Sequence, residues 1–324
     1  MLTESSVLNF KKNCDAILSE ISKDVVGEED IIRQTVIAII AGGNVLLEGV
    51  PGLGKTRLVR TLGRVLDMPF SRIQFTPDLM PADVTGTNIV IKDENGNVSF
   101  MFKKGPVFCS LLLADEITRA PPKTQSALLE AMQEHTVTVA GESYRLEEPF
   151  FVLATQNPIE QEGTYPLPEA QMDRFMFKVL VPFPSDADLK DIVVMTQKKT
   201  DAVSEKQIDR EELLEMRDVA REIPVSDTVL DYVAALIGKT HPERENCSPA
   251  AAKYLRFGAS PRAAQALVSG AKVLALMSGR YNASVNDIKT LAYPVLRHRI
   301  ALNFEAVTGG LSPDDVIKLI IEEN

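Results

Sequence analysis

The sequence lacks tryptophan altogether and contains only three cysteines and three histidines among its 324 residues. The cysteines Cys14, Cys109 and Cys247 lie far apart, and none belongs to a CxxC pair. This odd number and wide spacing indicate that the chain has no disulfide framework and favour a reducing compartment. The histidines are equally dispersed, so the sequence shows no zinc-binding pattern.

Long apolar segments and an excess of basic charge are also missing. The longest apolar run near the start, Val36 to Ala41, is far shorter than the ~20 residues that a membrane span needs. The N-terminus has no basic start followed by an apolar run, so we expect no signal peptide. The net charge of −10 argues against coating of nucleic acid by bulk electrostatics and against adsorption on an anionic membrane. We therefore expect a cytoplasmic protein without membrane insertion, and we do not expect nucleic acid as its partner.

What the sequence does contain is an alternation of short apolar strands and amphipathic helices. Two helices are expected before residue 43, with a break near Gly27. The strand candidates are Val45–Leu47, Arg72–Phe75, Ser110–Ala114, Phe150–Thr155 and Met176–Val181. Helical patterns at Lys55–Leu66 and Lys123–Glu134 lie between them. Continuous apolar strands between helices predict an α/β fold: a buried, mostly parallel sheet with helices on both faces.

Two segments with alternating apolar residues interrupt this pattern. One surrounds Asn95-Gly96 and the other surrounds Ala140-Gly141, so each predicts a β-hairpin, near residues 89–102 and 136–146. Their local pattern alone is typical of ordinary surface hairpins. After residue 184 only helical patterns follow. We therefore expect an α/β domain at residues 1–184 and a helical domain at residues 185–324.

The segment from Gly49 to Thr56 reads GVPGLGKT and fits the phosphate-binding pattern G-x-x-x-x-G-K-[ST]. Glycines let the backbone curl so that successive N–H groups face phosphate oxygens, and the following helix contributes the positive end of its dipole. Lys55 is expected to contact the β- and γ-phosphates, and the Thr56 hydroxyl to ligate Mg²⁺. A chance match is on the order of one in a hundred, and a strand before and a helix after it favour the functional interpretation. The expected ATP-binding residues of this segment are Gly49, Pro51, Gly52, Leu53, Gly54, Lys55, Thr56 and Arg57.

Two further strands end in polar residues. An apolar strand delivers Asp115 and Glu116 to its carboxyl end, where ligands sit in open α/β sheets. Asp115 is expected to hold Mg²⁺ through water, and Glu116 to act as general base. Alone, an Asp-Glu pair is equally typical of a helix N-cap. Asn157 ends another strand and could orient the attacking water if the two strands are neighbours, although Asn-Pro alone indicates a turn.

Four segments together resemble the MoxR family of AAA+ ATPases. They are GNVLLEGVPGLGKT at 43–56, LLADEITRAPPKTQSALLEAM at 112–132, ATQNP at 154–158 and TYPLPEAQMDRF at 164–175. These segments cover most of residues 25–182, and the helical remainder resembles the family's lid. The resemblance implies a P-loop AAA+ core followed by an all-helical lid domain, with ATP and Mg²⁺ as ligands.

The resemblance also implies roles that local chemistry does not show. The family forms ring oligomers, usually hexamers, with ATP between subunits. Arg174 in MDRF then corresponds to an arginine finger acting in trans, although an isolated arginine is more often a surface or ion-pair residue. Arg262 resembles the sensor 2 arginine that contacts phosphate in cis, whereas its local sequence only indicates a helix start. Val26 and Gly27 match the segment that packs on adenine.

The function implied by the resemblance is hydrolysis of ATP to ADP and phosphate by a chaperone-like remodeller or activator of a protein partner. Family members commonly act with proteins that carry von Willebrand factor A domains, and the two hairpins match inserts that face the ring pore. The client is not identified. A nucleic-acid-associated or chelatase-like motor is the alternative, because Lys92, Lys103, Lys104 and Arg145 leave a basic pore open. A nucleotide-dependent scaffold is a third interpretation, against which the catalytic base Glu116 argues.

Overall fold

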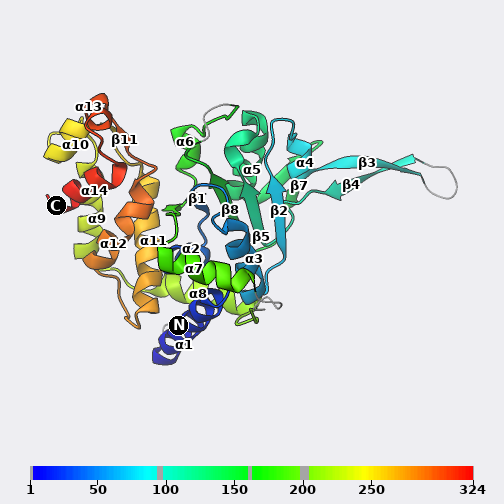
Figure 1. Cartoon of the computed structure of the whole chain (residues 1–324), viewed down its shortest axis with the longest axis horizontal. Helices are drawn as coiled ribbons and strands as arrows, with labels where there is room; N and C mark the ends of the chain where they lie inside the picture. Colours follow the sequence, from blue (N-terminus) through cyan, green and yellow to red (C-terminus); the bar gives the residue numbers. More distant parts are fainter. Residues whose placement is uncertain (1–2, 93–97, 160–162, 198–203, 324) are drawn as a thin grey trace.

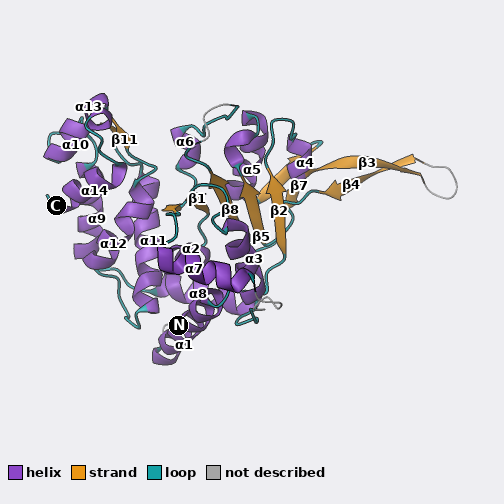
Figure 2. Cartoon of the chain, in the orientation of Figure 1, coloured by secondary structure: helices purple, strands orange, loops and turns teal. Residues whose placement is uncertain are grey.

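The computed structural model describes residues 3–92, 98–159, 163–197 and 204–323, and is built around a five-stranded parallel sheet. Its strands are β1 (Val45–Glu48), β2 (Phe70–Gln74), β5 (Leu111–Asp115), β8 (Phe151–Gln156) and β9 (Phe177–Leu180). The strand order is β2-β5-β8-β1-β9, and every neighbouring pair is parallel. The predicted α/β class is therefore confirmed (Figures 1 and 2).

Helices cover both faces of this sheet because its strands are apolar on both sides. Leu111 and Leu113 pack into one hydrophobic core, whereas Leu112 and Ala114 of the same strand pack into a second core on the opposite face. The first core contains α1 (Glu4–Ser22), α2 (Glu29–Ala41) and α3 (Lys55–Val65), and the second contains α5 (Pro122–Glu134). The sheet is thus a rigid platform whose carboxyl edge is free to carry a site.

The C-terminal half is mainly helical. Its helices are α7 (Asp186–Thr196), α8 (Arg210–Glu222), α9 (Asp227–Lys239), α10 (Pro249–Tyr254), α11 (Pro261–Met277), α12 (Val285–Leu296), α13 (Phe304–Thr308) and α14 (Pro313–Glu322). Most of them contribute to the same core as α1 and α2, and Figure 1 shows them beside the sheet. The expected domain boundary at residues 184/185 falls between β9 and α7.

A short antiparallel ribbon in this half was not predicted. It joins β10 (Leu255–Phe257) to β11 (Ala301–Leu302). The expectation of helices alone from Asp186 onward was therefore wrong at this ribbon. Strands of two or three residues are too short to show a period of two, so the sequence pattern could not reveal them.

Two antiparallel hairpins project from the α/β core. The first pairs β3 (Gly86–Lys92) with β4 (Val98–Lys104) and extends far from the body of the molecule (Figure 1). The second pairs β6 (Thr136–Val139) with β7 (Glu142–Arg145). The expected Asn95-Gly96 turn lies outside the described residues. The remaining short elements are α4 (Pro81–Thr85), the 3₁₀ turn η1 (Ile117–Arg119) and α6 (Glu169–Met172). Across the described ranges, no helix is long and apolar enough to cross a membrane.

The base of the long hairpin depends on two glycines whose backbones touch. A Cβ atom on Gly105 would lie 2.4 Å from the amide nitrogen of Gly86 and 2.5 Å from the carbonyl oxygen of Val84. Backbone atoms cannot swing aside as a flexible side chain can. Any larger residue at position 105 must therefore push the hairpin away from α4.

We expect Gly105→Ala to lower the free energy of unfolding by about 1–3 kcal/mol, the usual range for overpacking. The measurement is urea unfolding followed by circular dichroism. Gly238→Ala is the matched control, because Gly238 lies inside α9 and its added Cβ would meet only the mobile end of Arg244. That control should be neutral or more stable, by up to ~1 kcal/mol. Equal stability of the two variants would show that the hairpin base is not close-packed.

Candidate active site

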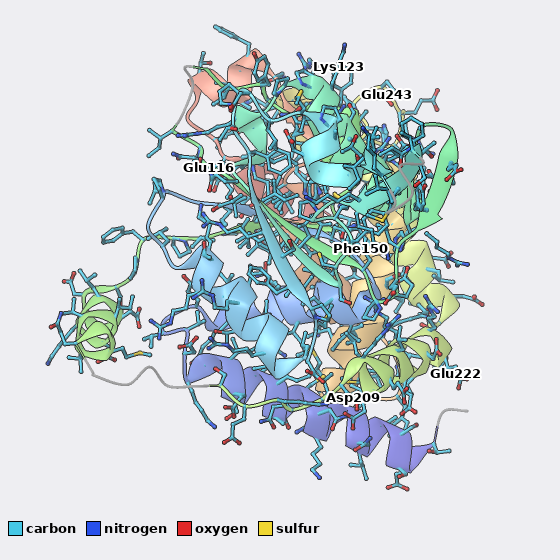
Figure 3. The ribbon with its side chains drawn as sticks, turned by 90° about the vertical axis from the view of Figure 1, so that its right-hand side faces the viewer. Glu116, Lys123, Phe150, Asp209, Glu222 and Glu243 are labelled. Carbon is cyan, nitrogen blue, oxygen red and sulfur yellow. The ribbon has the colours of Figure 1, made fainter. Side chains whose placement is uncertain are left out.

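The carboxyl ends of three neighbouring strands surround a cavity of about 300 Å³. The segment after β1 supplies a loop and the start of α3, while β5 and β8 end in polar residues. Figure 3 shows Glu116 at the opposite end of the strands from Phe150, which directly precedes β8. The cavity is lined by Pro51, Gly52, Leu53, Gly54, Lys55, Thr56, Arg72, Gln74, Asp115, Glu116, Thr155, Gln156 and Asn157. The structure therefore brings most of the expected catalytic and phosphate-binding residues together.

The loop of this cavity has the backbone that the glycine pattern predicts. Gly52 and Gly54 adopt φ angles of +88° and +76°, in the left-handed region that favours glycine. No atom outside the loop lies within 4 Å of a Cβ built on either residue, so this side of the loop faces open space. At Gly49, by contrast, a Cβ would lie 2.8 Å from the Val181 side chain. The Lys55 ammonium donates a hydrogen bond to the Gly49 carbonyl oxygen across the loop.

Thr155 fixes the two acidic residues relative to each other. Its hydroxyl donates to Asp115 Oδ1 at 2.7 Å and accepts from the Glu116 amide at 2.8 Å. The second carboxylate oxygen of Asp115 accepts from the Arg72 guanidinium at 2.6 Å. Each carboxylate oxygen can accept about two hydrogen bonds, so capacity for a metal-bound water remains.

Glu116 sits in a sparsely populated backbone conformation, with φ +57° and ψ +50°. Non-glycine residues in the left-handed region are uncommon and concentrate at functional sites. Its carboxylate accepts a hydrogen bond from Gln74 Nε2 at 2.8 Å and forms an ion pair with Arg119, whose Nε lies 3.1 Å away. The side chain is therefore held over the cavity by residues on both sides of it.

The sequence analysis did not single out Arg72, Gln74 or Thr155. Arg72 and Gln74 lie near the end of β2, and Thr155 lies near the end of β8. Both strands flank β5, so their ends must lie beside Asp115. The sequence shows polar residues at the carboxyl ends of these strands. It does not show the strand order, which determines that they lie beside Asp115.

Asn157 combines both interpretations that its sequence allowed. It lines the cavity together with Glu116, as a water-positioning residue should. Its side-chain oxygen also accepts from the backbone amide of Ile159 at 3.1 Å, as in a turn.

A second, more apolar cavity of about 350 Å³ adjoins the phosphate loop. It is lined by Asp24, Val25, Val26, Glu28, Pro51, Gly52, Leu53, Gly54, Arg57, Phe183, Pro184, Leu189, Ile192 and Met195. Since the same loop residues border both cavities, one elongated ligand could occupy them together. Gly27 has φ +75°, and a Cβ there would lie 2.5 Å from Asp188 of α7. Val26 thus faces the apolar cavity, while Gly27 lets α7 approach.

Arg57 lines the apolar cavity, not the phosphate cavity. Its Nε and Nη2 atoms donate to Asp24 Oδ1 at 3.0 and 2.6 Å. The other oxygen of this buried carboxylate accepts from the Thr61 hydroxyl. Both donors belong to α3, so Asp24 ties the segment that contains Val26 to the helix that begins at Lys55.

In the two cavities, the Lys55 ammonium is surrounded by carboxylates. Burial lowers the pKa of Lys55, and the neighbouring carboxylates of Asp115, Glu116, Glu28 and Glu48 act in the opposite direction. Burial raises the pKa of Glu28 to about 7, although Lys55 works against this shift. A bare triphosphate would meet several negative groups here. A divalent cation that accompanies it would offset their repulsion.

Oxygen ligands suited to Mg²⁺ are present at this site. The Thr56 hydroxyl and the Asp115 carboxylate both line the phosphate cavity. In the parts of the chain that the structure describes, no three His, Cys, Asp or Glu side chains gather to hold a metal by themselves. Mg²⁺ commonly takes one or two protein oxygens and completes its shell with water and substrate phosphates, so this sparse set fits it.

Arg174 and Arg262 lie in a third cavity, of about 300 Å³, which they share with Arg299. Arg174 Nη1 donates to the Leu129 carbonyl oxygen at 2.8 Å. Arg262 Nη1 lies 3.5 Å from the Asp173 carboxylate. Neither arginine lines the cavities beside the phosphate loop. The structure therefore brings these two arginines together and separates them from the nucleotide-binding loop of their own chain.

Comparison with known proteins agrees with this arrangement. Residues 44–177 match the family described as "ATPase family associated with various cellular activities (AAA)", and residues 248–320 match the "AAA lid domain". A crystal structure of a candidate ATPase from Cytophaga hutchinsonii superposes with a TM-score of 0.91 at 42% identity, covering 99% of this chain and 97% of that one.

Relatives of similar length include proteins with the MoxR name. The chain is 40% identical to "Chaperone MoxR1" of Mycobacterium tuberculosis, over 94% of this chain and 79% of that protein. It is 30% identical to "Protein MoxR" of Methylorubrum extorquens, over 94% and 92%. An uncharacterized Bacillus subtilis protein, YeaC, is 40% identical over 94% and 92%. With its parallel sheet, phosphate loop and lid, the chain belongs to the MoxR family of AAA+ ATPases.

Proposed function

We propose that the protein is a cytoplasmic ATP hydrolase that uses Mg²⁺, converts ATP to ADP and phosphate, and thereby remodels or activates a protein partner. One observation carries the hydrolytic part of this proposal: Lys55, Thr56, Asp115 and Glu116 line one cavity at the carboxyl edge of the sheet. Ligands of open α/β sheets bind at this edge. Scaffolding alone would need no general base, so the presence of Glu116 supports turnover.

Each residue of the cavity has a distinct task in this mechanism. Lys55 and the backbone N–H groups of the loop bind the β- and γ-phosphates. Glu116 accepts the proton of the attacking water, and the hydrogen bond from Gln74 and the ion pair with Arg119 orient its carboxylate. Asn157 holds that water. When bound by Thr56 and, through water, by Asp115, Mg²⁺ supplies positive charge against the triphosphate.

The arginines of the third cavity suggest that the site is completed by a neighbouring subunit. Arg174 Nε is buried and has no hydrogen-bond partner within the described ranges, although a buried donor normally has one. The side chain as a whole is only partly buried and lines the third cavity, so we infer that its guanidinium can turn toward a phosphate of an adjacent subunit, as an arginine finger in trans requires. Arg262 shares this cavity, so we place its phosphate contact, expected in cis, on the neighbour's nucleotide as well. We therefore propose a ring oligomer, with six subunits as in the family.

The long hairpin supports a protein as the partner. Val90, Phe100 and Met101 on β3 and β4 are 58%, 75% and 46% exposed. Exposed apolar side chains that are grouped together favour contact with another polypeptide. With Ile91 and Val98, the exposed apolar residues of β3 and β4 are five, against the three lysines Lys92, Lys103 and Lys104 on the same strands. The net charge of −10 also repels nucleic acid. A partner with a von Willebrand factor A domain follows from the family resemblance, and the client is open.

Lys55→Ala and Glu116→Gln should separate binding from turnover. We expect Lys55→Ala to weaken Mg-ATP binding about 10- to 100-fold, since it removes a charged hydrogen bond of about 1.5–3 kcal/mol. Glu116→Gln should bind Mg-ATP within about twofold of the parent and lose turnover about 10²–10⁴-fold, as expected for a missing general base. Isothermal titration calorimetry and phosphate release measure the two quantities. Normal turnover in Glu116→Gln would rule out its role as base.

Mixed oligomers test the assignment of Arg174. Arg174→Ala alone should lose turnover about 10³-fold while it keeps nucleotide affinity, because the finger stabilises transition-state charge. Lys55→Ala subunits carry an intact Arg174 and should restore part of the phosphate release when mixed with Arg174→Ala subunits. Absence of recovery at every mixing ratio would contradict action in trans.

The Glu116→Gln variant also tests the kind of partner. Because it holds ATP without turnover, it should retain a protein partner in a pulldown with Mg-ATP and release it with Mg-ADP. Lys55→Ala, which binds ATP poorly, is the control. For the parent protein, single- or double-stranded DNA or RNA should not raise phosphate release. Stimulation by nucleic acid with a steep dependence on salt would favour the motor interpretation instead.

A further inference from the structure

The segment that carries Arg174 is fastened to the lid by one buried side chain. Arg299 follows α12 and is 2% exposed. Its Nε donates to Asp173 Oδ1 at 2.8 Å, and its Nη2 donates to the carbonyl oxygens of Asp173 and Phe175 at 3.1 and 2.6 Å. Its Nη1 donates to the Met176 carbonyl oxygen at 3.0 Å. The Arg299 guanidinium thus forms hydrogen bonds to the chain on both sides of Arg174.

Two neighbours of Arg299 strengthen this attachment. His298 Nε2 lies 3.0 Å from the Phe175 carbonyl oxygen and donates to it. Complete burial holds the pKa of His298 well below its usual value, so the ring remains a neutral donor at neutral pH. At the N-terminus of α11, the Ser260 hydroxyl donates to the Asp173 carboxylate at 2.9 Å. The flanks of Arg174 are therefore anchored from two places in the lid.

Arg174 itself needs such an anchor, because its side chain is long and its own restraint is slight. Among the described residues, its side chain donates a single hydrogen bond, to the Leu129 carbonyl oxygen. A planar arginine fork fixes the direction as well as the distance of the groups it binds, which a lysine ammonium cannot do. The Arg299 guanidinium makes one further hydrogen bond, to the Val295 carbonyl oxygen of α12, and within the described residues its other hydrogen bonds go to residues 173, 175 and 176.

We propose that Arg299 is a positioning residue for Arg174, which it holds to the lid so that the finger can reach a neighbouring subunit's nucleotide. This inference rests on the trans role proposed above for Arg174. Arg299 lines the same cavity as Arg174 and Arg262, so its loss would displace the finger without touching the phosphate loop of its own chain. The orientation of the finger then follows the lid of the subunit that supplies it.

The test is Arg299→Lys, which keeps the positive charge and removes the fork. We expect nucleotide affinity and oligomer size within twofold of the parent, and phosphate release about 10²-fold lower, the order that a misplaced catalytic group produces. Lys55→Ala subunits have intact Arg299 and Arg174. Mixing them with Arg299→Lys subunits should restore turnover, since Arg299→Lys leaves its own loop, Asp115 and Glu116 unchanged.

Arg297→Lys is the matched control for loss of an arginine fork in the lid, at a partly buried position. Arg297 is 11% exposed, pairs with Asp314 and donates to the Lys178 carbonyl oxygen at 3.2 Å, without touching residues 173–176. It should lower the melting temperature as Arg299→Lys does, yet keep the turnover of the parent. If Arg299→Lys does not fold, Asp173→Asn replaces it: it keeps the backbone bonds of Arg299 and should give a smaller loss with the same recovery on mixing.

The outcomes separate this inference from the function on which it rests. If Arg174→Ala recovers with Lys55→Ala subunits but Arg299→Lys does not, Arg299 is only structural and the trans finger stands. Full turnover in Arg299→Lys, or an equal loss in Arg297→Lys, overturns the positioning role as well. If neither Arg174→Ala nor Arg299→Lys recovers, both proposals fail.

Discussion

The parallel pairing of β5 between β2 and β8 is the constraint on which the site depends. Parallel strands end at the same edge of a sheet, so three sets of polar side chains must converge once the order is fixed. Thr155 fixes the relative positions of the two acidic residues. Its hydroxyl donates a hydrogen bond to the Asp115 carboxylate and accepts one from the Glu116 backbone amide. The apolar cores on both faces keep the strands from sliding, so the carboxylates keep their separation.

The sequence predicted the α/β core and the phosphate loop because both depend on local pattern. Buried strands show as apolar runs, and the loop needs glycines at fixed places. The sequence did not identify Arg72, Gln74 and Thr155 as site residues, because their position beside Asp115 depends on the strand order. The placement of Arg262 beside Asp173 depends on how the lid packs. The ribbon of β10 and β11 was missed because its strands are too short to show a period.

The charges of the chain are divided between two separate cavities. Carboxylates and Lys55 gather at the phosphate loop, whereas Arg174, Arg262 and Arg299 gather in another cavity with Asp173. Among the described residues that line the phosphate cavity, Arg72 is the single arginine, and its guanidinium donates a hydrogen bond to the Asp115 carboxylate. Phosphoryl transfer needs positive charge around the transferred group. A second copy that brings its arginine cavity to the loop of the first would supply that charge, which gives a physical reason for assembly.

The apolar cavity beside the phosphate loop lies between the segment of Val25 and Val26 and helix α7. Asp24 links Val25 and Val26 to α3 through Arg57 and Thr61, so the loop and this wall move together. The opposite wall is α7, which stands apart from the body of the chain in Figure 3 although Leu189, Ile192 and Met195 face the cavity. An apolar ring placed between the walls would bury surface on both and draw α7 inward. The helical half that begins with α7 also contains Arg299, which bonds residues 173, 175 and 176 on both sides of Arg174.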